Sequence, residues 1–452
     1  MVFQAEVCVG DAKALIQGLA ENSIDAVITD PPYELKTSAG RGFMGQAWDG
    51  SGVAFNVDLW EQVLRALKPG GMLAAFGSPR TWHRLAVAIE DAGFEIRDSI
   101  AWIHAQGMPH GLDLSKAADK KLGGVRKQVG VASDFARDGF TRKTDGGHQK
   151  PAAGQGGHGY QDRWSAPVTM PATSAAKQLE GWNSSLKPAM EPIVIARKPF
   201  KGALIDNVLT HGVGGINVGA CRIGDADIQI NVLEKCSPHG QVKKADYVPK
   251  QSKGRYPTNV VFTHHEDCEE ECHLDCQIET LNQQAGLRHS GANPKRRNAD
   301  KFRTTYRRFG GEKENLNATR GQEDNLASAF FPTFRFQSKA STRERPKSGR
   351  HQHTTVKPLD LMRWLTRLIT PTGGVVLDPF AGSGTGAEAA LLENMHFVGF
   401  EQDPKHLELV KIRMDRIGAQ TTINTGKITA IRPTDRSDSL NPSKSKPAGD
   451  SQ

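Results

Sequence analysis

The sequence predicts an α/β fold with a largely parallel sheet, and two observations at opposite ends of the chain support this prediction. Near the N-terminus, apolar runs at 5–9 and 23–29 flank a segment with helical spacing. Near the C-terminus, strands predicted at 374–378 and 396–400 flank a helix predicted at 387–393. Two strands joined by one helix form the unit from which parallel sheets are built, so both ends of the chain belong to such a sheet.

The segments between these ends continue the alternation. After a helix at 59–67, which stops at Pro69 and Gly70, a strand is expected at 72–76, a helix at 82–92 and a strand at 94–102. A further strand is expected at 191–197 and a further helix at 355–370.

The composition is that of a soluble protein of two or three domains. The chain has 452 residues, 37% of them hydrophobic and 24% charged, with a net charge of +8. Because no apolar run is long enough to span a membrane and no signal segment precedes the first strand, we expect a cytoplasmic protein without a membrane partner. Six cysteines in a chain of this length do not indicate a disulfide framework.

The first chemically informative stretch is Asp30-Pro31-Pro32-Tyr33, which follows the strand at 23–29. Two prolines end that strand and place Asp30 at its carboxyl end, the edge of an open α/β sheet at which ligands bind. A carboxylate, carbonyl groups without neighbouring N–H donors and an aromatic ring suit the binding of a nucleobase amino group. The alternative is a turn that merely ends a strand.

The second informative stretch is Asp378-Pro379-Phe380-Ala381-Gly382-Ser383-Gly384-Thr385, a strand end followed by a glycine-rich turn that opens a helix. Glu401 ends the next strand, 23 positions after Asp378, a spacing that suits a carboxylate bound to ribose hydroxyls. Gly382, Gly384 and Ala387 also satisfy a loose dinucleotide-binding pattern, so an NAD-dependent oxidoreductase is a competing interpretation. Asp11 is a further strand-end carboxylate, with helix capping as the alternative role.

Positive charge is concentrated in one part of the chain. Residues 288–350 contain 16 Lys and Arg against 6 Asp and Glu, a local net charge of +10, with aromatic residues interleaved. This pattern favours contacts to nucleic-acid phosphates and bases, although a solvated surface is the plainer alternative. The basic residues that we select as candidate DNA contacts are Lys295, Arg296, Arg297, Arg307 and Arg308. Two aromatic residues, Phe43 and Trp48, in a Gly-rich loop after Tyr33 are further candidates.

Histidines and cysteines crowd between residues 264 and 276. His264, His265, Cys268, Cys272, His273 and Cys276 include the ligand types that zinc prefers, and four of them would complete a tetrahedral site. The cysteines are spaced four apart, unlike the tighter pairs of common zinc modules, so we predict no metal and keep a zinc site at Cys268, Cys272 and Cys276 as the alternative.

The two informative stretches together resemble the amino-group DNA methyltransferases that use S-adenosylmethionine. The order, with the catalytic tetrapeptide first and the glycine turn last, is similar to the β class, as is the stretch Thr355-Val356-Lys357-Pro358. Segments such as Gly42-Phe43-Met44-Gly45 resemble prophage-type members. The resemblance implies a permuted Rossmann-like fold, with a seven-stranded, mostly parallel sheet between helices and an inserted target-recognition lobe.

The resemblance also implies residue roles. Asp30, Pro31, Pro32 and Tyr33 would handle a flipped base, and Phe43, Trp48 and the basic residues would contact DNA. The S-adenosylmethionine pocket would consist of Asp11, Ala12, Lys357, Pro358, Asp378, Phe380, Ala381, Gly382, Gly384, Thr385 and Glu401. An Asp at the first tetrapeptide position favours N6 of adenine over N4 of cytosine.

This interpretation divides the chain into six segments. They are a catalytic half at 1–122, a mobile Gly-rich insertion at 123–180, a returning strand at 181–199, a target-recognition lobe at 200–340, a cofactor half at 341–417 and a disordered tail at 418–452. The expected partner is double-stranded DNA. A homodimer is compatible with the sequence, and the setting would be bacterial or phage-encoded and nucleoid-associated.

Three other functions stay open at this point. They are an N4-cytosine DNA methyltransferase, an RNA or protein methyltransferase, and a catalytically silent DNA-binding regulator. No nuclease motif is found, so modification without cleavage is the expectation.

Overall fold

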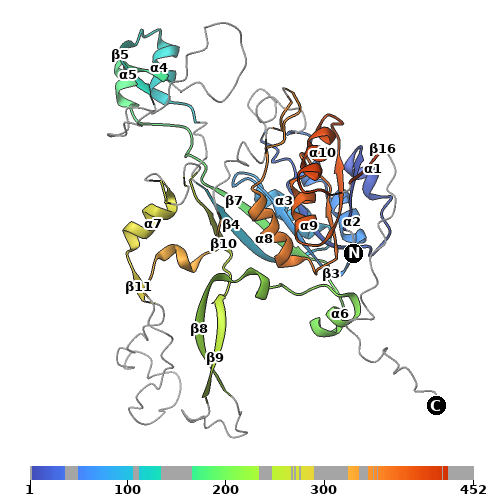
Figure 1. Cartoon of the computed structure of the whole chain (residues 1–452). Coiled ribbons are helices and arrows are strands. Elements are labelled where there is room, and N and C mark those ends of the chain that lie inside the picture. Colours follow the sequence, from blue (N-terminus) through green and yellow to red (C-terminus); the bar gives the residue numbers. More distant parts are fainter. Residues whose placement is uncertain are drawn as a thin grey trace, which may run out of the picture. The chain divides into compact units, whose positions relative to one another are not determined.

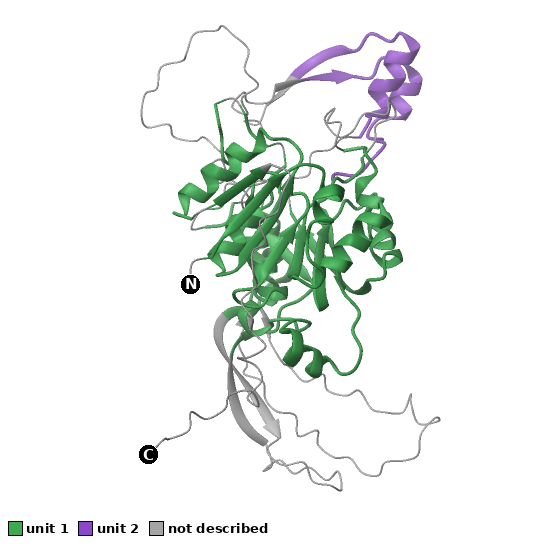
Figure 2. Cartoon of the chain, turned by 90° about the vertical axis from the view of Figure 1, so that its right-hand side faces the viewer, with its two compact units in different colours: residues 1–106, 189–452 green, residues 107–188 purple. Residues whose placement is uncertain are grey.

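A ten-stranded sheet organises the computed structural model, which is drawn in Figure 1. The structure describes residues 3–35, 49–104, 111–133, 165–233, 247–265, 268, 271–273, 276–289, 324–334, 345–349, 351–353, 355–419 and 421–425. These residues divide into two compact units, unit 1 (1–106 and 189–452) and unit 2 (107–188), which Figure 2 colours separately.

The sheet belongs to unit 1 and has the strand order β13-β10-β4-β7-β3-β2-β14-β15-β1-β16. Only β7 runs antiparallel to its neighbours β3 and β4, and the other pairs are parallel. The strands are β1 (Ala5–Val9), β2 (Ile24–Thr29), β3 (Leu67–Phe76), β4 (Glu95–Ile103), β7 (Met190–Arg197), β10 (Val260–Thr263), β13 (Thr333–Phe334), β14 (Val375–Asp378), β15 (His396–Glu401) and β16 (Thr421–Thr425). The seven contiguous strands from β4 to β1 match the predicted seven-stranded sheet, and β10, β13 and β16 extend its two edges.

Helices cover both faces of the sheet because its strands bury side chains alternately on each side. In β3, Met72, Ala74 and Phe76 pack with helices α8, α9 and α10, whereas Leu73 and Ala75 pack with α1, α2 and α3. The first group is α8 (Leu359–Ile369), α9 (Thr385–Leu392) and α10 (His406–Arg416), and the second is α1 (Ala12–Ile16), α2 (Val57–Ala66) and α3 (Trp82–Asp91). The predicted layered α/β fold is confirmed.

The remaining elements of unit 1 lie in the predicted target-recognition lobe. They are α6 (Leu204–His211), the hairpin of β8 (Ile223–Leu233) and β9 (Tyr247–Arg255), α7 (Gln277–Ala285), and the short strands β11 (Arg288–His289) and β12 (Asp324–Asn325). Strands β11 and β12 pair antiparallel with each other. Short 3-10 turns lie at Val53–Phe55, Gly219–Cys221 and Ala327–Phe330.

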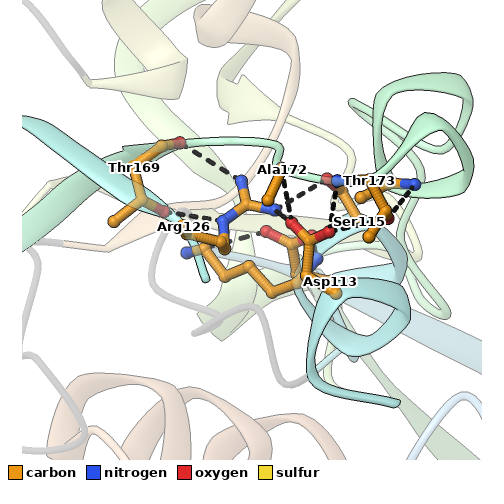
Figure 3. A network of polar contacts seen from close by, with 9 residues as sticks. Asp113, Ser115, Arg126, Thr169, Ala172 and Thr173 are labelled. Atoms are coloured by element: carbon orange, nitrogen blue, oxygen red, sulfur yellow. Dashed lines mark hydrogen bonds and ion pairs between the residues drawn. The ribbon is translucent and has the colours of Figure 1, made fainter. Parts of the chain in front are cut away.

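Unit 2 contains α4 (Leu114–Leu122), α5 (Ser174–Gln178) and the hairpin of β5 (Lys127–Ser133) and β6 (Ser165–Met170). Asp119 is fully buried at its centre. Its carboxylate accepts hydrogen bonds from the backbone N–H of Ala172 at 3.0 Å and of Thr173 at 2.8 Å, and pairs with Arg126 at 2.7 Å. Arg126 also donates to Thr169, as Figure 3 shows, so one network joins α4 to β6 and to the residue directly before β5.

Two segments that the sequence predicts to be mobile or disordered contain secondary structure, so these two predictions are wrong in part. The insertion predicted at 123–180 includes β5, β6 and α5, because a hairpin and a buried carboxylate order its two ends. The tail predicted to be disordered from 418 includes β16, whose β-branched residues pair with the edge of β1 that would otherwise be unpaired. The other domain boundaries stay predictions. Among the described residues, no helix has the length and apolar character needed to cross a bilayer.

Candidate active site

Four carboxylates lie at the carboxyl ends of four adjacent parallel strands. In spatial order, Asp30 follows β2, Asp378 ends β14, Glu401 ends β15 and Asp11 follows β1. The register places Val9 beside Glu401, and the backbone N–H of Gly10 donates to the Glu401 carbonyl at 3.0 Å. The topology therefore brings together at one edge residues that are separated by more than 300 positions in the chain, as the sequence predicted.

Asp30 is held by Lys357. The Lys357 Nζ donates to Asp30 Oδ2 at 2.5 Å and lies 3.4 Å from Glu191 Oε2. Asp30 Oδ1 is buried and accepts no hydrogen bond from the part of the chain that the structure describes. One oxygen of the carboxylate is thus fixed by a cation, while the other is an unused acceptor.

Tyr33 belongs to the same group. Its hydroxyl donates to Glu191 Oε2 at 2.6 Å, and Lys357 Nζ lies 5.2 Å from the centre of its ring. Lys357 Nζ also lies 4.9 Å from the centre of the Phe76 ring. Ring faces carry partial negative charge, so they favour the ammonium group in this buried position.

The backbone after Tyr33 is fixed in an uncommon conformation. Glu34 has a positive φ of 56°, and its buried carboxylate accepts from the Gly52 N–H at 2.8 Å. Thr81 Oγ1 donates to the Tyr33 carbonyl at 2.8 Å. A non-glycine residue in the left-handed region costs free energy, and these contacts offset that cost while the turn presents Asp30 and Pro31.

Burial and charge act on these groups in opposite senses. Burial raises the pKa of Asp30, and the positive charge of Lys357 opposes that rise. Burial lowers the pKa of Lys357, but the charges of Asp30 and Glu191 outweigh it, so the pKa lies above its ordinary value. Burial also raises the pKa of Tyr33, with the carboxylates of Asp30 and Glu191 adding to the effect. The two carboxylates thus favour the charged form of Lys357 beside the Asp30 carboxyl group, because they raise its pKa.

Asp378 connects this group to the glycine turn. Its Oδ1 accepts from Thr29 Oγ1 at 2.6 Å and from the Phe380 N–H at 3.0 Å. Burial raises the pKa of Asp378 to about 7, despite these hydrogen bonds. Because Thr29 immediately precedes Asp30, this contact fixes the end of β2 against the start of the turn.

The glycine turn itself is shaped by Glu401 and by an arginine beneath it. Gly382 and Gly384 have φ values of +53° and +79°, and the Gly382 N–H donates to Glu401 Oε2 at 2.8 Å. Glu401 Oε1 accepts from the Asp403 N–H at 2.8 Å and lies 3.1 Å from His406 Nδ1. The buried Arg413 donates to the Ser383 carbonyl at 3.1 Å and pairs with Glu388. A carboxylate offers about four acceptor positions, which exceeds the two backbone N–H groups and one histidine nitrogen that contact Glu401 among the described residues, so room is left for a ligand.

The other predicted site residues are placed as follows. Asp11 caps α1 by accepting from the Ala14 N–H at 3.1 Å, which is the alternative role that the sequence left open, and Ala12 is the first residue of that helix. Pro31, Pro358, Ala381 and Thr385 are buried, and Phe380 packs against the core. Phe43, Trp48, Lys295, Arg296, Arg297, Arg307 and Arg308 lie outside the described residues.

Three features of the site were not assigned from the sequence. The sequence predicts only that Glu191 lies in a strand, whereas in the structure its carboxylate accepts from the Tyr33 hydroxyl and lies near the Lys357 ammonium group. Lys357 was expected in the cofactor pocket, and its ammonium group contacts Asp30.

His353 lies against Gly382, where an added Cβ would be 3.2 Å from its Nε2, and its ring is 4.4 Å from that of His406. Burial lowers the pKa of His353 to about 4, and His406 adds to the shift. The sequence feature that could have indicated this contact is the closely spaced pair His351 and His353, shortly before Lys357.

Short stretches of the chain are similar to known methyltransferases. The chain is 44% identical over 68 residues to the type II methyltransferase M.HindIII of Haemophilus influenzae, covering 15% of this chain and 21% of the relative. It is 47% identical over 57 residues to M.BglI of Bacillus subtilis, covering 13% and 16%. The matched stretches thus span about a fifth of the length of these relatives.

Two solved structures are distant matches. The M1.HpyAVI–SAM complex has a TM-score of 0.37 and 14% identity, covering 91% of this chain and 99% of that one. The cytosine-N4-specific PvuII DNA methyltransferase has a TM-score of 0.37 and 11% identity, covering 94% and 96%.

The family comparison extends over most of the chain. The family model described as N6_N4_Mtase, DNA methylase, matches residues 24–412, a range that begins at β2 and ends inside α10. It includes both Asp30 with its tetrapeptide and the glycine turn with Glu401. The chain belongs to the N6/N4 DNA methylase family.

Proposed function

We propose that this protein transfers a methyl group from S-adenosylmethionine to the N6 amino group of an adenine that is flipped out of duplex DNA. Membership of the N6/N4 DNA methylase family supports the reaction class. The observation that carries the proposal is the buried Asp30 Oδ1, which accepts no hydrogen bond from the described residues and lies at a strand end where the preceding Thr29 donates to Asp378.

The glycine turn has the features that a bound S-adenosylmethionine requires. Gly382 and Gly384 adopt the positive-φ conformations that shape the turn, and Glu401 keeps an acceptor position for a ribose hydroxyl. When bound there, this cofactor supplies an electrophilic methyl group on a sulfonium. The roles of Asp378, Phe380, Thr385 and Pro358 as its contacts are part of the proposal.

Asp30 would act on the amino group of the base. The lone pair of an exocyclic amine is conjugated with the ring, and it localises on nitrogen when the N–H groups donate to strong acceptors. Asp30 Oδ1 and the Pro31 carbonyl are such acceptors, and Pro32 has no N–H that would compete. The residues therefore mainly position the amine for direct in-line transfer, without a covalent intermediate.

Lys357 and Glu191 would keep this acceptor in place. Lys357 binds only Oδ2 of Asp30, so the carboxylate is oriented with Oδ1 available. Glu191 accepts from the Tyr33 hydroxyl and so fixes the ring, whose proposed role is to stack on the flipped base. Unpairing the base costs a few kcal/mol, and the basic stretch at 288–350 is the proposed source of the compensating phosphate contacts.

The direct test is methylation of unmethylated genomic DNA with tritiated S-adenosylmethionine, followed by digestion to nucleosides and mass spectrometry. We expect N6-methyladenine. N4-methylcytosine would keep the reaction class and overturn the choice of base, and the absence of any methylated nucleoside would overturn the proposed reaction.

We predict that Asp30→Ala reduces the methylation rate by at least about a hundredfold, because the acceptor that localises the amine lone pair is lost. Binding of S-adenosylmethionine, measured by titration calorimetry, should change little, since Asp30 acts on the base. The matched control is Asp91→Ala, which removes an exposed carboxylate at the end of α3. A D30A variant with wild-type turnover would contradict the catalytic assignment.

A further inference from the structure

Four metal-binding side chains converge outside the proposed active site, in the connection between β10 and α7. They are His264, directly after β10, Cys268, Cys272, and Cys276, the residue that precedes α7. Their ligand atoms all lie within 4.8 Å of one another. None of the three cysteines is in a disulfide.

Two of the distances among these atoms match the edges of a tetrahedral site, and the remaining distances are at most 4.8 Å. The His264 Nδ1 lies 3.4 Å from Cys272 Sγ and 3.7 Å from Cys276 Sγ. Zinc bonds of about 2.0–2.3 Å to nitrogen and sulfur give tetrahedron edges of about 3.4–3.8 Å. His264, Cys272 and Cys276 are thus already spaced as ligands of one ion, and a shift of about 1 Å at most would bring the remaining ligand atoms to the same spacing.

The structure also selects one histidine among the three that the sequence offers. The rings of His265 and His273 stack on each other, with centroids 4.8 Å apart and an interplanar angle of 17°. Only His264 has a ring nitrogen grouped with all three sulfurs. The backbone N–H of His273 instead donates to Cys268 Sγ at 3.2 Å, the kind of contact that stabilises a metal-bound thiolate.

We propose that His264, Cys268, Cys272 and Cys276 bind one zinc ion, and that this ion has a structural role. Three thiolates and one imidazole fill all four positions of a tetrahedral ion, so none is left for a catalytic water. Binding of the metal releases the thiol protons to solvent, and the oxidation state of the ion does not change.

The ion would connect the edge of the sheet to the helix of the target-recognition lobe. His264 is joined to β13 through its N–H, which donates to the Phe334 carbonyl at 3.0 Å. Cys276 is the N-cap residue of α7, and its carbonyl accepts from the Thr280 N–H at 2.9 Å. A ligand on each element fixes the first turn of α7 relative to β10, and α7 leads through Gly286 into β11.

The first test is the metal content of the full-length protein, purified with a reductant but without chelator. We expect about one zinc per chain by inductively coupled plasma mass spectrometry. Replacement by Co²⁺ should give the intense visible bands of a tetrahedral site and a near-ultraviolet charge-transfer band from thiolate to cobalt. A protein that holds no zinc, or a Co²⁺ spectrum without thiolate bands, would overturn the proposal.

Variants identify the ligands. Cys272→Ala and His264→Ala should retain less than about a tenth of the wild-type zinc, because a site with three ligands binds far more weakly. The matched controls are Cys221→Ala, a buried cysteine outside the cluster, and His273→Ala, a neighbouring histidine that we do not assign as a ligand. Full zinc content in C272A, or its loss in H273A with retention in H264A, would contradict the assignment.

Hydrogen exchange tests the structural role on the unmodified chain. Removal of zinc by a chelator should increase exchange at the amides of α7 at least about tenfold and leave the amides of β14 unchanged. Equal protection of α7 with and without zinc would overturn the structural role. None of these measurements depends on methyl transfer, so the zinc site and the proposed reaction can fail separately.

Discussion

At the residue scale, the proposed chemistry depends on an ion pair in which one carboxylate oxygen accepts no hydrogen bond from the residues that the structure describes. Lys357 neutralises Asp30, and its contact is confined to Oδ2. Breaking a buried pair by removing one partner leaves an uncompensated charge, which is costly, so the carboxyl group would take up a proton instead. A protonated carboxyl group is a much weaker acceptor for an amine.

We therefore predict that Lys357→Met lowers kcat roughly tenfold to a hundredfold and moves the acid limb of the kcat–pH profile to higher pH. The sign follows from burial, which raises the pKa of Asp30, and from Lys357, whose charge opposes that rise. Without the lysine the pKa rises further, and deprotonation requires a higher pH. The measurement is the pH dependence of methyl transfer under saturating substrates.

A matched control exists for this variant. Lys68 forms a largely buried pair with Asp25 at 2.7 Å, at the amino-terminal ends of β3 and β2 and so opposite the carboxyl ends that carry the proposed site. Lys68→Met should lower stability without moving the acid limb, and Lys357→Arg should restore most of the wild-type profile. A shifted profile in K68M, or an unshifted one in K357M, would contradict the role of Lys357.

At the element scale, the glycine turn between β14 and α9 depends on backbone conformations that other residues rarely adopt. Gly384 precedes α9 with a φ of +79°, and a Cβ there would lie 3.1 Å from the side chain of Val410. The turn is thus restricted by conformation and by the packing of α10 at the same position.

We predict that Gly384→Ala raises the Kd for S-adenosylmethionine about tenfold or more. The backbone strain of about 1–2 kcal/mol and the contact of the new Cβ with Val410 would displace the turn. A loss of about 1.4 kcal/mol of binding free energy corresponds to a tenfold change in Kd. Titration calorimetry measures the change. The control is Gly123→Ala, which has a similar φ of +71° with nothing within 4 Å, and should leave the Kd unchanged. An equal Kd in wild type and G384A would count against this pocket.

At the scale of the whole molecule, a different feature stabilises each of the two units. Unit 1 is built on the sheet, whereas unit 2 is organised around the buried Asp119. Burial tends to raise the pKa of Asp119, but hydrogen bonds from Ala172 and Thr173 and the contact with Arg126 outweigh it and lower the pKa from 3.8 to about 2. A depressed pKa stabilises the folded state above the unfolded value, and that stabilisation is lost as the pH falls from about 4 to about 2.

We predict that Asp119→Asn increases hydrogen exchange in α4 and α5 at about pH 6, and that the difference from wild type disappears as the pH approaches 2. The amides of β2 and β14 should be unaffected at each pH. The measurement is exchange followed by mass spectrometry on the intact chain. A difference that persists at the lowest pH, or that extends equally to β14, would contradict this account.

The sequence by itself determined the layered fold, the position of Asp30 at a strand end, the glycine turn and the pairing of these motifs. All of these depend on local patterns: strand-length apolar runs, prolines that end a strand, and glycines ahead of a helix. The strand β16 was missed because a polar segment pairs only when an edge is available to it. Only the tertiary structure decided which side chains contact one another. Lys357 binds Asp30, 327 positions away in the sequence, and Glu191 binds Tyr33. Of the three neighbouring histidines, His264 is the one whose ring nitrogen lies among the cysteine sulfurs. Local periodicity says nothing about such contacts, because they form only when the strand order brings distant ends of the chain to the same edge of the sheet.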